Sequence, residues 1–188
     1  MIRKFVILAL GLLWLGAFSA CLLDPKEKPP EDPTPPVEFM DLSERWHVLH
    51  NLEAAYNQRR PTRYDELIDA NFVFFFSDGD VGGEIPVQWD RSQDVGATGR
   101  LLQDGISIDL DVQFDQLQWA AIVPADFPDE IWFTTTVNYT FTMRFNNDPE
   151  TTFITSGQPQ VQYTVRPVDV DGEQRWRLAE WRDIADQL

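Results

Sequence analysis

Apolar residues recur at helical spacing shortly after residue 40. They follow one another at intervals of three and four residues, the period of one face of an α-helix: Leu42, Trp46, Leu49, Leu52 and Tyr56. Asp41 with Glu44 three residues later forms the capping-box pattern that begins such a helix. We therefore predict a first helix that starts near Asp41 and ends at Arg59-Arg60-Pro61.

Two further helices and one strand follow from local signals. Thr62 is predicted to cap a shorter helix that carries Tyr64, Leu67 and Ile68. The run from Phe72 to Phe76 is apolar throughout and too short for a helix, which predicts a strand buried on both faces. A loop follows from Ser77 to Gly83, and Asp90 with Gln93 predicts the cap of a third helix running through Leu101 and Leu102.

From Ile106 onward the period changes to two, the period of a half-buried strand. Apolar residues alternate with polar ones from Ile106 to Phe114, and a slip at Gln116 predicts a β-bulge. The longest alternation covers residues 131–145, with Phe133, Val137, Tyr139 and Phe141 on one face. A strand is expected around 151–165, interrupted near Gly157 and Pro159, and Asp171-Gly172 predicts a hairpin turn before a last strand from Arg175 to Arg182.

This order of elements predicts an α+β domain. N-terminal helices would pack on one face of a curved, mostly antiparallel sheet. The segment NLEAAYNQRRPTRYDELIDANFVFFFSD resembles the opening of nuclear transport factor 2-like (NTF2-like), or SnoaL-like, domains, and WRLAEWRDI resembles their closing strand. The resemblance implies a cone-shaped half-barrel with a pocket between sheet and helices. Members include isomerases, dehydratases, cyclases and proteins with no known reaction, so the fold alone does not give the function.

Residues 1–20 have the pattern of a secretory signal peptide. A basic head with Arg3 and Lys4 precedes an apolar run from Phe5 to Phe18 and the small residues Ser19 and Ala20. Phe-Ser-Ala-Cys resembles the lipobox of bacterial lipoproteins, in which Cys21 becomes the first residue and carries acyl chains. The alternative is an uncleaved membrane helix, because the chain from Phe5 to Leu23 is uncharged and long enough to span a bilayer.

Cys21 is the only cysteine of the chain, so no intramolecular disulfide can form, and we expect this residue to be lipidated. Residues 21–38 would then be the lipidated cysteine and a stalk, because residues 24–38 hold six of the chain's 13 prolines. At roughly 3.1 Å per residue this spacer reaches about 45 Å. Leu22 after the cysteine favours the outer membrane, by resemblance to enteric lipoproteins. Residues 39–188 would form a single domain.

The charge of the chain limits its partners. The net charge is −16, and removing Arg3 and Lys4 with the leader leaves 13 basic against 31 acidic residues. Such an acidic surface argues against nucleic acid and against anionic headgroups as partners. We expect a membrane contact through the lipid on Cys21, and as further partner a small apolar ligand or another envelope protein.

Motifs that carry known chemistry are absent from the sequence. There is no phosphate-binding glycine loop, nucleophile elbow, HExxH motif or cysteine pair, and we predict no cofactor, metal or catalytic residue. The spacing of His47 and His50 would suit two metal ligands, but the helical period places both outside the apolar stripe, so we expect them to face solvent. Alternation predicts a solvated strand face, rather than a cation site, for three carboxylates: Asp109, Asp111 and Asp115.

Glu53 is the ionisable residue that the period places inside the apolar stripe. It is expected to form a salt bridge with Arg63 or an arginine of the last strand, or else to contact a ligand. Asp78 and Asp80 have a common turn composition, although some members of the resembled family hold a catalytic acid near that position. The candidate pocket residues are those that the resemblance directs toward the cone: Glu53, Tyr56, Asp78, Trp119, Tyr139, Tyr163 and Trp176. Phe74 and Phe76 are further aromatic candidates, and all these rings are first of all core residues.

Two functions remain open. The favoured one is a non-catalytic cell-envelope lipoprotein whose cone binds a small apolar ligand or a protein. The alternative is an isomerase, dehydratase or cyclase that uses general acid–base chemistry inside the cone. The catalytic groups of such enzymes pair an aspartate with a tyrosine, histidine or arginine, and none maps residue by residue onto this sequence. Whether the cone is open or filled by its own aromatic side chains separates the two.

Overall fold

The computed structural model describes residues 36–77, 88–103, 106–145, 148–154 and 160–184. The chain divides into two units, Met1–Pro35 and Pro36–Leu188, and every described residue belongs to the second. The predicted leader, Cys21 and most of the stalk, as well as Asp78 and Asp80, lie outside the described residues. Within the described part, no helix combines the length and the apolar character needed to span a membrane.

Three helices carry the N-terminal half of the domain: α2 (Arg45–Asn57), α3 (Pro61–Leu67) and α4 (Arg91–Gln103). Helix α2 begins later than predicted, with Glu44 as its N-cap. Asp41 instead accepts hydrogen bonds from the hydroxyl and backbone N–H of Ser43, at 2.7 and 3.0 Å. These bonds lower the pKa of Asp41 to about 2. Leu42 adopts a left-handed conformation with φ 64°, so the helix cannot continue back through it.

The starts of the other two helices follow from their first residues. Pro61, rather than the predicted Thr62, opens α3, because the fixed φ of proline suits the first helical position, where no N–H is needed. The predicted cap of α4 is confirmed. Gln93 N–H donates to Asp90 Oδ1 at 2.9 Å, and Asp90 N–H donates to Gln93 Oε1 at 3.1 Å.

Among the described residues, eight strands form one curved sheet. Their bounds are β1 Ile68–Phe75, β2 Gln88–Asp90, β3 Ile106–Val112, β4 Ala120–Ile122, β5 Trp132–Phe145, β6 Asp148–Ile154, β7 Gln160–Val170 and β8 Glu173–Ile184. The order is β2-β1-β8-β7-β5-β3, and β4 and β6 also pair with β5. All pairs are antiparallel except β1 with β8, which is parallel. The predicted mostly antiparallel α+β class is therefore confirmed.

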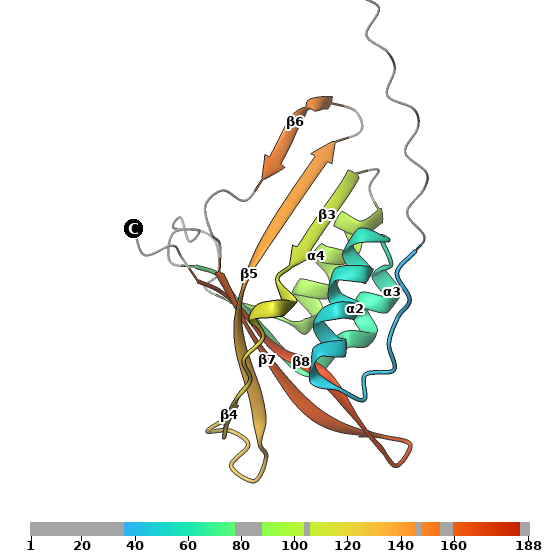
Figure 1. Cartoon of the computed structure of the whole chain (residues 1–188). Helices are drawn as coiled ribbons and strands as arrows, with labels where there is room; N and C mark the ends of the chain where they lie inside the picture. The colour runs from blue at the N-terminus through green and yellow to red at the C-terminus, as the bar shows by residue number, and fades with distance from the viewer. Residues whose placement is uncertain (1–35, 78–87, 104–105, 146–147, 155–159, 185–188) are drawn as a thin grey trace, which may run out of the picture. The chain divides into compact units, whose positions relative to one another are not determined.

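The longest predicted strand is confirmed as β5, which has 14 residues and bends strongly along its length (Figure 1). The strand expected at 151–165 is two strands, β6 and β7, which pair with different halves of β5. The slip at Gln116 is a short 3-10 turn, Phe114–Gln116, instead of a bulge. Strand β1 starts earlier than predicted, and within it Val73, Phe74 and Phe75 are only half-buried.

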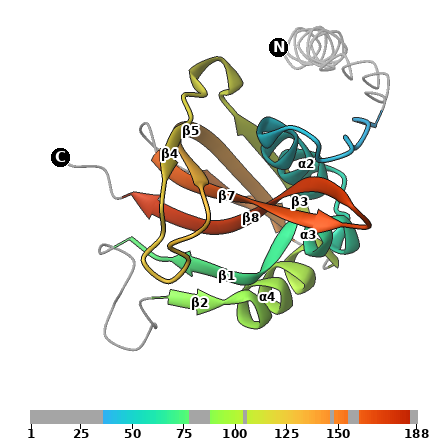
Figure 2. The ribbon, with the colours of Figure 1, turned by 90° about the horizontal axis from the view of Figure 1, so that it is seen from below.

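The helices lie together on one face of this sheet (Figure 1), with α4 next to β1 and β2 (Figure 2). The turn between β7 and β8 has positive φ at Asp171 (56°) and Gly172 (82°), the geometry that an Asp-Gly hairpin turn requires. Between helices and sheet lies a cluster of buried apolar side chains contributed by all the helices and by the long strands.

Candidate functional site

A row of side chains crosses the inner face of the sheet. The strand register aligns residues of β2, β1, β8, β7 and β5 in one line: Trp89, Phe74, Trp181, Tyr163 and Thr135. The ring centroids of Phe74 and Trp181 are 5.6 Å apart, and those of Trp181 and Tyr163 are 5.1 Å apart. Tyr56 of α2 completes the cluster, because its ring lies 6.3 Å from Trp181. Helix and sheet therefore meet through aromatic rings at the centre of the cone.

These rings leave little exposed surface at the centre. Tyr163 has no exposed surface, while Tyr56 and Trp181 are 7 % and 8 % exposed. Edge-on contacts, such as that of Tyr163 with Trp181 at an interplanar angle of 68°, are a favourable arrangement of aromatic pairs. The two predicted pocket residues Tyr56 and Tyr163 are thus brought together, but as parts of a packed cluster.

The helices add a buried hydrogen bond to this cluster. The Tyr64 hydroxyl donates to Asp94 Oδ2 at 2.5 Å, and Asp94 is only 4 % exposed. Burial raises the pKa of Asp94 to about 6, although the hydrogen bond from Tyr64 works in the opposite direction. The Tyr64 ring also contacts Tyr56, at 5.6 Å and nearly perpendicular.

Sequence reasoning missed Asp94 altogether. Its signal is weak: Asp94, Thr98 and Leu102 are the buried residues of α4, and they stand four residues apart on one face. Two of these three positions are polar, so a search for an apolar stripe passes over them. Only the tertiary structure shows that this face of α4 packs inward.

Two hydroxyls of the cone have unused hydrogen-bonding capacity. The side-chain oxygens of Tyr163 and Thr135 are buried and have no partner in the described part of the chain. These residues stand directly opposite each other on β7 and β5. Burial, followed by the nearby Tyr56 hydroxyl, raises the pKa of Tyr163, so this phenol stays neutral. Such a pair could hydrogen-bond a water or one polar atom of a ligand.

Glu53 contacts the edge of the sheet instead of an arginine. Val112 N–H donates to Glu53 Oε2 at 3.0 Å, whereas the predicted partner Arg63 pairs with Glu66 at 2.8 Å. Desolvation raises the pKa of Glu53, the hydrogen bond from Val112 opposes that shift, and the charges of Asp111 and Asp109 add to it. The predicted bridge between Glu53 and an arginine is therefore wrong.

Asn57, one turn after Glu53, continues this contact. Its Nδ2 donates to the Leu110 carbonyl at 2.8 Å, and its Oδ1 accepts the Leu110 N–H at 2.7 Å. Strand β3 stands at the end of the strand order, so in the described part of the chain no neighbouring strand pairs with these backbone groups on that side. Glu53 and Asn57 thus provide hydrogen-bond partners for backbone groups at the free edge of β3, which edge strands commonly require.

Trp119 and Trp176 belong to a separate group around Arg45. The Arg45 guanidinium carbon lies 4.0 Å from the Phe133 ring centroid, 5.8 Å from Trp119 and 5.7 Å from Trp176. The aromatic residues predicted to line one pocket therefore divide between two clusters. Tyr139 is half-buried on β5, where it stands opposite Val112.

The two histidines were expected to face solvent, and this expectation is wrong. Both are half-buried against the segment that precedes α2. His47 Nδ1 lies 3.0 Å from Asp41 Oδ1, and His50 Nε2 lies 3.1 Å from the Glu38 carbonyl. Trp46 also departs from the predicted stripe, because it is 39 % exposed.

The carboxylates of β3 and the following turn behave as predicted, since Asp109, Asp111 and Asp115 are exposed. Within the described ranges, no group of three or more histidine, cysteine or carboxylate side chains is placed to hold a metal ion.

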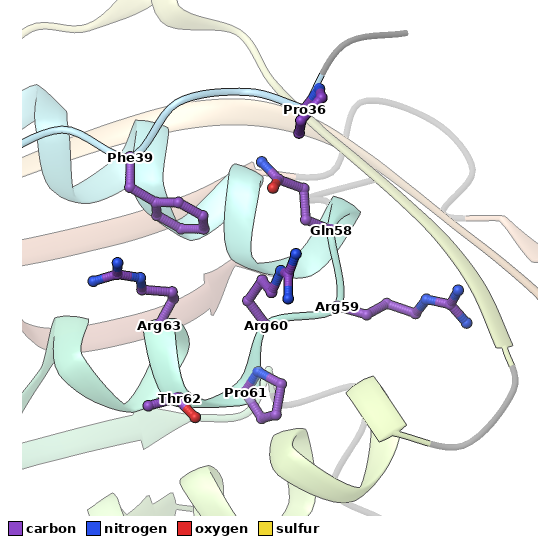
Figure 3. Close-up of a pocket in the computed structure, with 8 residues that line it drawn as sticks. All are labelled: Pro36, Phe39, Gln58, Arg59, Arg60, Pro61, Thr62 and Arg63. Carbon is purple, nitrogen blue, oxygen red and sulfur yellow. The ribbon is translucent and has the colours of Figure 1, made fainter. Parts of the chain in front are cut away.

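A cavity of about 540 Å³ lies outside the cone, where the segment before α2 passes the α2–α3 turn (Figure 3). It is lined by Pro36, Phe39, Gln58, Arg59, Arg60, Pro61, Thr62 and Arg63. The sequence marked Arg59 and Arg60 only as the end of a helix. Their position around a cavity depends on Pro36 and Phe39, which come from another part of the chain.

Comparison with solved structures identifies the fold. A conserved protein from Planctomyces limnophilus is 12% identical, and the match covers 73% of this chain and 89% of that one, with a TM-score of 0.52. A ketosteroid isomerase-like protein from Erwinia carotovora atroseptica is 9% identical, with 76% and 94% covered and a TM-score of 0.50. The fold is NTF2-like.

An NTF2-like protein of unknown function in nutrient uptake from Rhodospirillum rubrum is also similar, at 11% identity, with 75% and 97% covered and a TM-score of 0.48. No protein-family profile and no curated protein sequence matches the chain. At these identities the likeness to NTF2-like structures concerns the fold alone, so the function has to be argued from the residues of this chain.

Proposed function

We propose that this chain is a lipid-anchored protein of the bacterial cell envelope whose NTF2-like domain is a non-catalytic binding module. The leader pattern, the single cysteine Cys21 and the proline-rich stalk support the anchor, and Leu22 after the cysteine favours the outer membrane. One observation carries the second half of the proposal. The centre of the cone is occupied by the chain's own rings, with Tyr56, Tyr163 and Trp181 all less than 9 % exposed.

A catalytic cone has to admit its substrate to the reacting groups. Here Trp181 contacts Phe74 on one side and Tyr163 on the other, and Tyr56 contacts it from the helices. Opening this cluster would expose several aromatic rings. Fully burying one such side chain contributes about 1.5–3 kcal/mol to the stability of the folded state, and this contribution would be lost. A partner that binds outside the cone does not require that cost, which is why we favour a binding module.

The anchor is tested by metabolic labelling. In a host with lipoprotein machinery the protein should take up labelled palmitate, because the thiol of Cys21 would be the acylated group. Cys21→Ser should abolish the label, while Ser19→Ala, next to the same exit, should retain it. Label that persists in the Cys21→Ser protein would contradict the anchor.

The closed cone is tested with N-phenyl-1-naphthylamine, a neutral fluorescent probe of apolar pockets, on residues 36–188. The domain should give no saturable binding, because rings already occupy the interior. Trp181→Ala should create an apolar cavity and bind the probe, as large truncations in packed cores do. Trp46→Ala removes an equal ring from the surface and should bind none. One-to-one binding by the unmodified domain would contradict the proposal.

One observation favours the second function, an acid–base enzyme. The pKa of Asp94, raised to about 6 by burial, lies in the range suited to a general acid or base. Its hydrogen-bond partner Tyr64 has no exposed surface, however, and Asp94 itself is 4 % exposed. A substrate would have to displace the Tyr64 hydroxyl to reach this carboxyl group, so we rank the enzyme second.

A further inference from the structure

The turn between α2 and α3 places three arginines around the outer cavity. Arg59, Arg60 and Arg63 line its space of about 540 Å³, together with Phe39 and Gln58. The described residues of the lining include no carboxylate. This is a local reversal of sign in a chain whose net charge is −16.

The backbone explains why these arginines gather. Arg60 N–H donates to the Ala55 carbonyl at 2.8 Å, and Arg59 N–H donates to the Tyr56 carbonyl at 3.1 Å. This is the Schellman pattern that ends a helix, and Pro61 starts α3 directly after it. Arg59 holds the left-handed position of the motif with φ 52°, where glycine is the favoured residue. The chain thus carries a cation at a position where its backbone conformation favours glycine.

Neighbouring contacts hold the walls of the cavity. Gln58 Nε2 donates to the Val37 carbonyl at 2.6 Å, which ties the segment before α2 to the end of the helix. The Arg63 guanidinium carbon lies 5.3 Å from the Phe39 ring centroid, and its Nη1 bonds Glu66 at 2.8 Å. Arg63 is therefore positioned from two sides.

Arg60 is the cation best placed to meet a ligand. Its side chain is exposed, and its guanidinium has no ion pair within the described ranges. Figure 3 shows it projecting toward Gln58 in the space between Arg63 and Arg59, while Arg59 extends away from the other two. The site is therefore centred on Arg60, with Arg63 beside it.

The chemistry of the cavity selects an anion. A guanidinium presents a planar fork of N–H donors that matches two oxygens of a phosphate group, and Arg60 offers such a fork without a competing carboxylate. The Debye length is about 8–10 Å at physiological ionic strength, so the acidic remainder of the surface is largely screened from a ligand in the cavity. The net charge, which argues against anionic partners in general, does not decide what binds here.

We propose that this cavity binds a phosphate-bearing anion. Pro36 and Phe39, which line the cavity, belong to the segment that precedes α2. An anionic lipid headgroup and a soluble phosphate compound both offer the required group. The site does not depend on the lipid anchor, because all its residues belong to the folded domain.

The test uses the full chain in a neutral detergent. Amide hydrogen exchange of residues 57–63 is followed against rising inorganic phosphate, with chloride at matched ionic strength as reference. Phosphate should slow exchange in this segment, because a bound ligand stabilises the folded conformation of the turn between α2 and α3. The phosphate concentration that gives half of the maximal protection should be at least tenfold higher in Arg60→Gln than in the unmodified protein. Arg100→Gln removes the same charge from an exposed residue of α4 and should change it less than twofold.

A second arm identifies the source of the phosphate group. The same proteins are placed in phosphatidylcholine vesicles with and without phosphatidylglycerol. Protection of residues 57–63 by both free phosphate and anionic vesicles supports a headgroup ligand, and protection by phosphate alone supports a soluble one. Absence of protection in both arms, or an equal loss in Arg60→Gln and Arg100→Gln, would overturn the site. Because the phosphate arm needs no acylation, its failure is distinct from a failure of palmitate labelling.

Discussion

Replacing Arg166 with alanine is expected to lower the free energy of unfolding by about 3–5 kcal/mol. Arg166 of β7 bonds Glu130 Oε1 through Nη2 at 2.8 Å and Asp69 Oδ1 through Nη1 at 3.3 Å. Asp69 is only 5 % exposed, so the variant would leave a buried carboxylate without its cation. The rings of Phe127 and Trp132 also contact the guanidinium, at 4.9 and 5.1 Å, and would lose that packing.

Urea denaturation of residues 36–188 measures this loss. Arg144→Ala is the matched control, because Arg144 is an exposed arginine on β5, and it should change the free energy of unfolding by no more than about 0.5 kcal/mol. Adding Asp69→Asn to Arg166→Ala should recover part of the loss, since the unpaired charge is then removed. An Arg166→Ala loss below about 1 kcal/mol would show that Asp69 does not depend on this arginine.

Asp94→Asn is expected to stabilise the domain at neutral and higher pH. The pKa of Asp94 is raised from 3.8 to about 6, so between these values the folded state binds the proton more tightly than the unfolded state. The contribution of Asp94 to the free energy of unfolding is therefore fully present below about pH 4 and is lost as the pH rises through about 6. A shift of this size corresponds to about 3 kcal/mol at pH 8. An asparagine still accepts the Tyr64 hydrogen bond but carries no buried charge.

Urea midpoints of Asp94→Asn and of the unmodified domain should thus be similar near pH 4 and diverge toward pH 8, with the variant the more stable. Asp109→Asn, at an exposed position of β3, should follow the unmodified domain throughout. Parallel pH profiles of Asp94→Asn and the unmodified domain would mean that Asp94 is ionised in the fold without cost. That result would also remove the observation that favours an acid–base enzyme.

Local signals in the sequence determined the elements of this fold. The cap of α4 by Asp90 and Gln93, the end of α2 at Arg59-Arg60-Pro61 and the Asp171-Gly172 turn were all predictable. So were the alternation of β3 and β5 and the mostly antiparallel α+β class. Each depends on hydrogen bonds or side-chain periods within a few residues, which is the range over which sequence patterns carry information.

Contacts between distant segments decided the rest. The parallel pairing of β1 with β8, the Tyr64–Asp94 bond across 30 residues and the Glu53 contact with β3 across 59 residues have no local signature. Glu53 shows the reason. The helical period placed its carboxylate on an inner face, but which donor meets it depends on how α2 packs along the edge of the sheet. The filled centre of the cone and the cavity lined by Arg60 and Phe39 likewise depend on tertiary packing, because their residues come from separate elements of the chain.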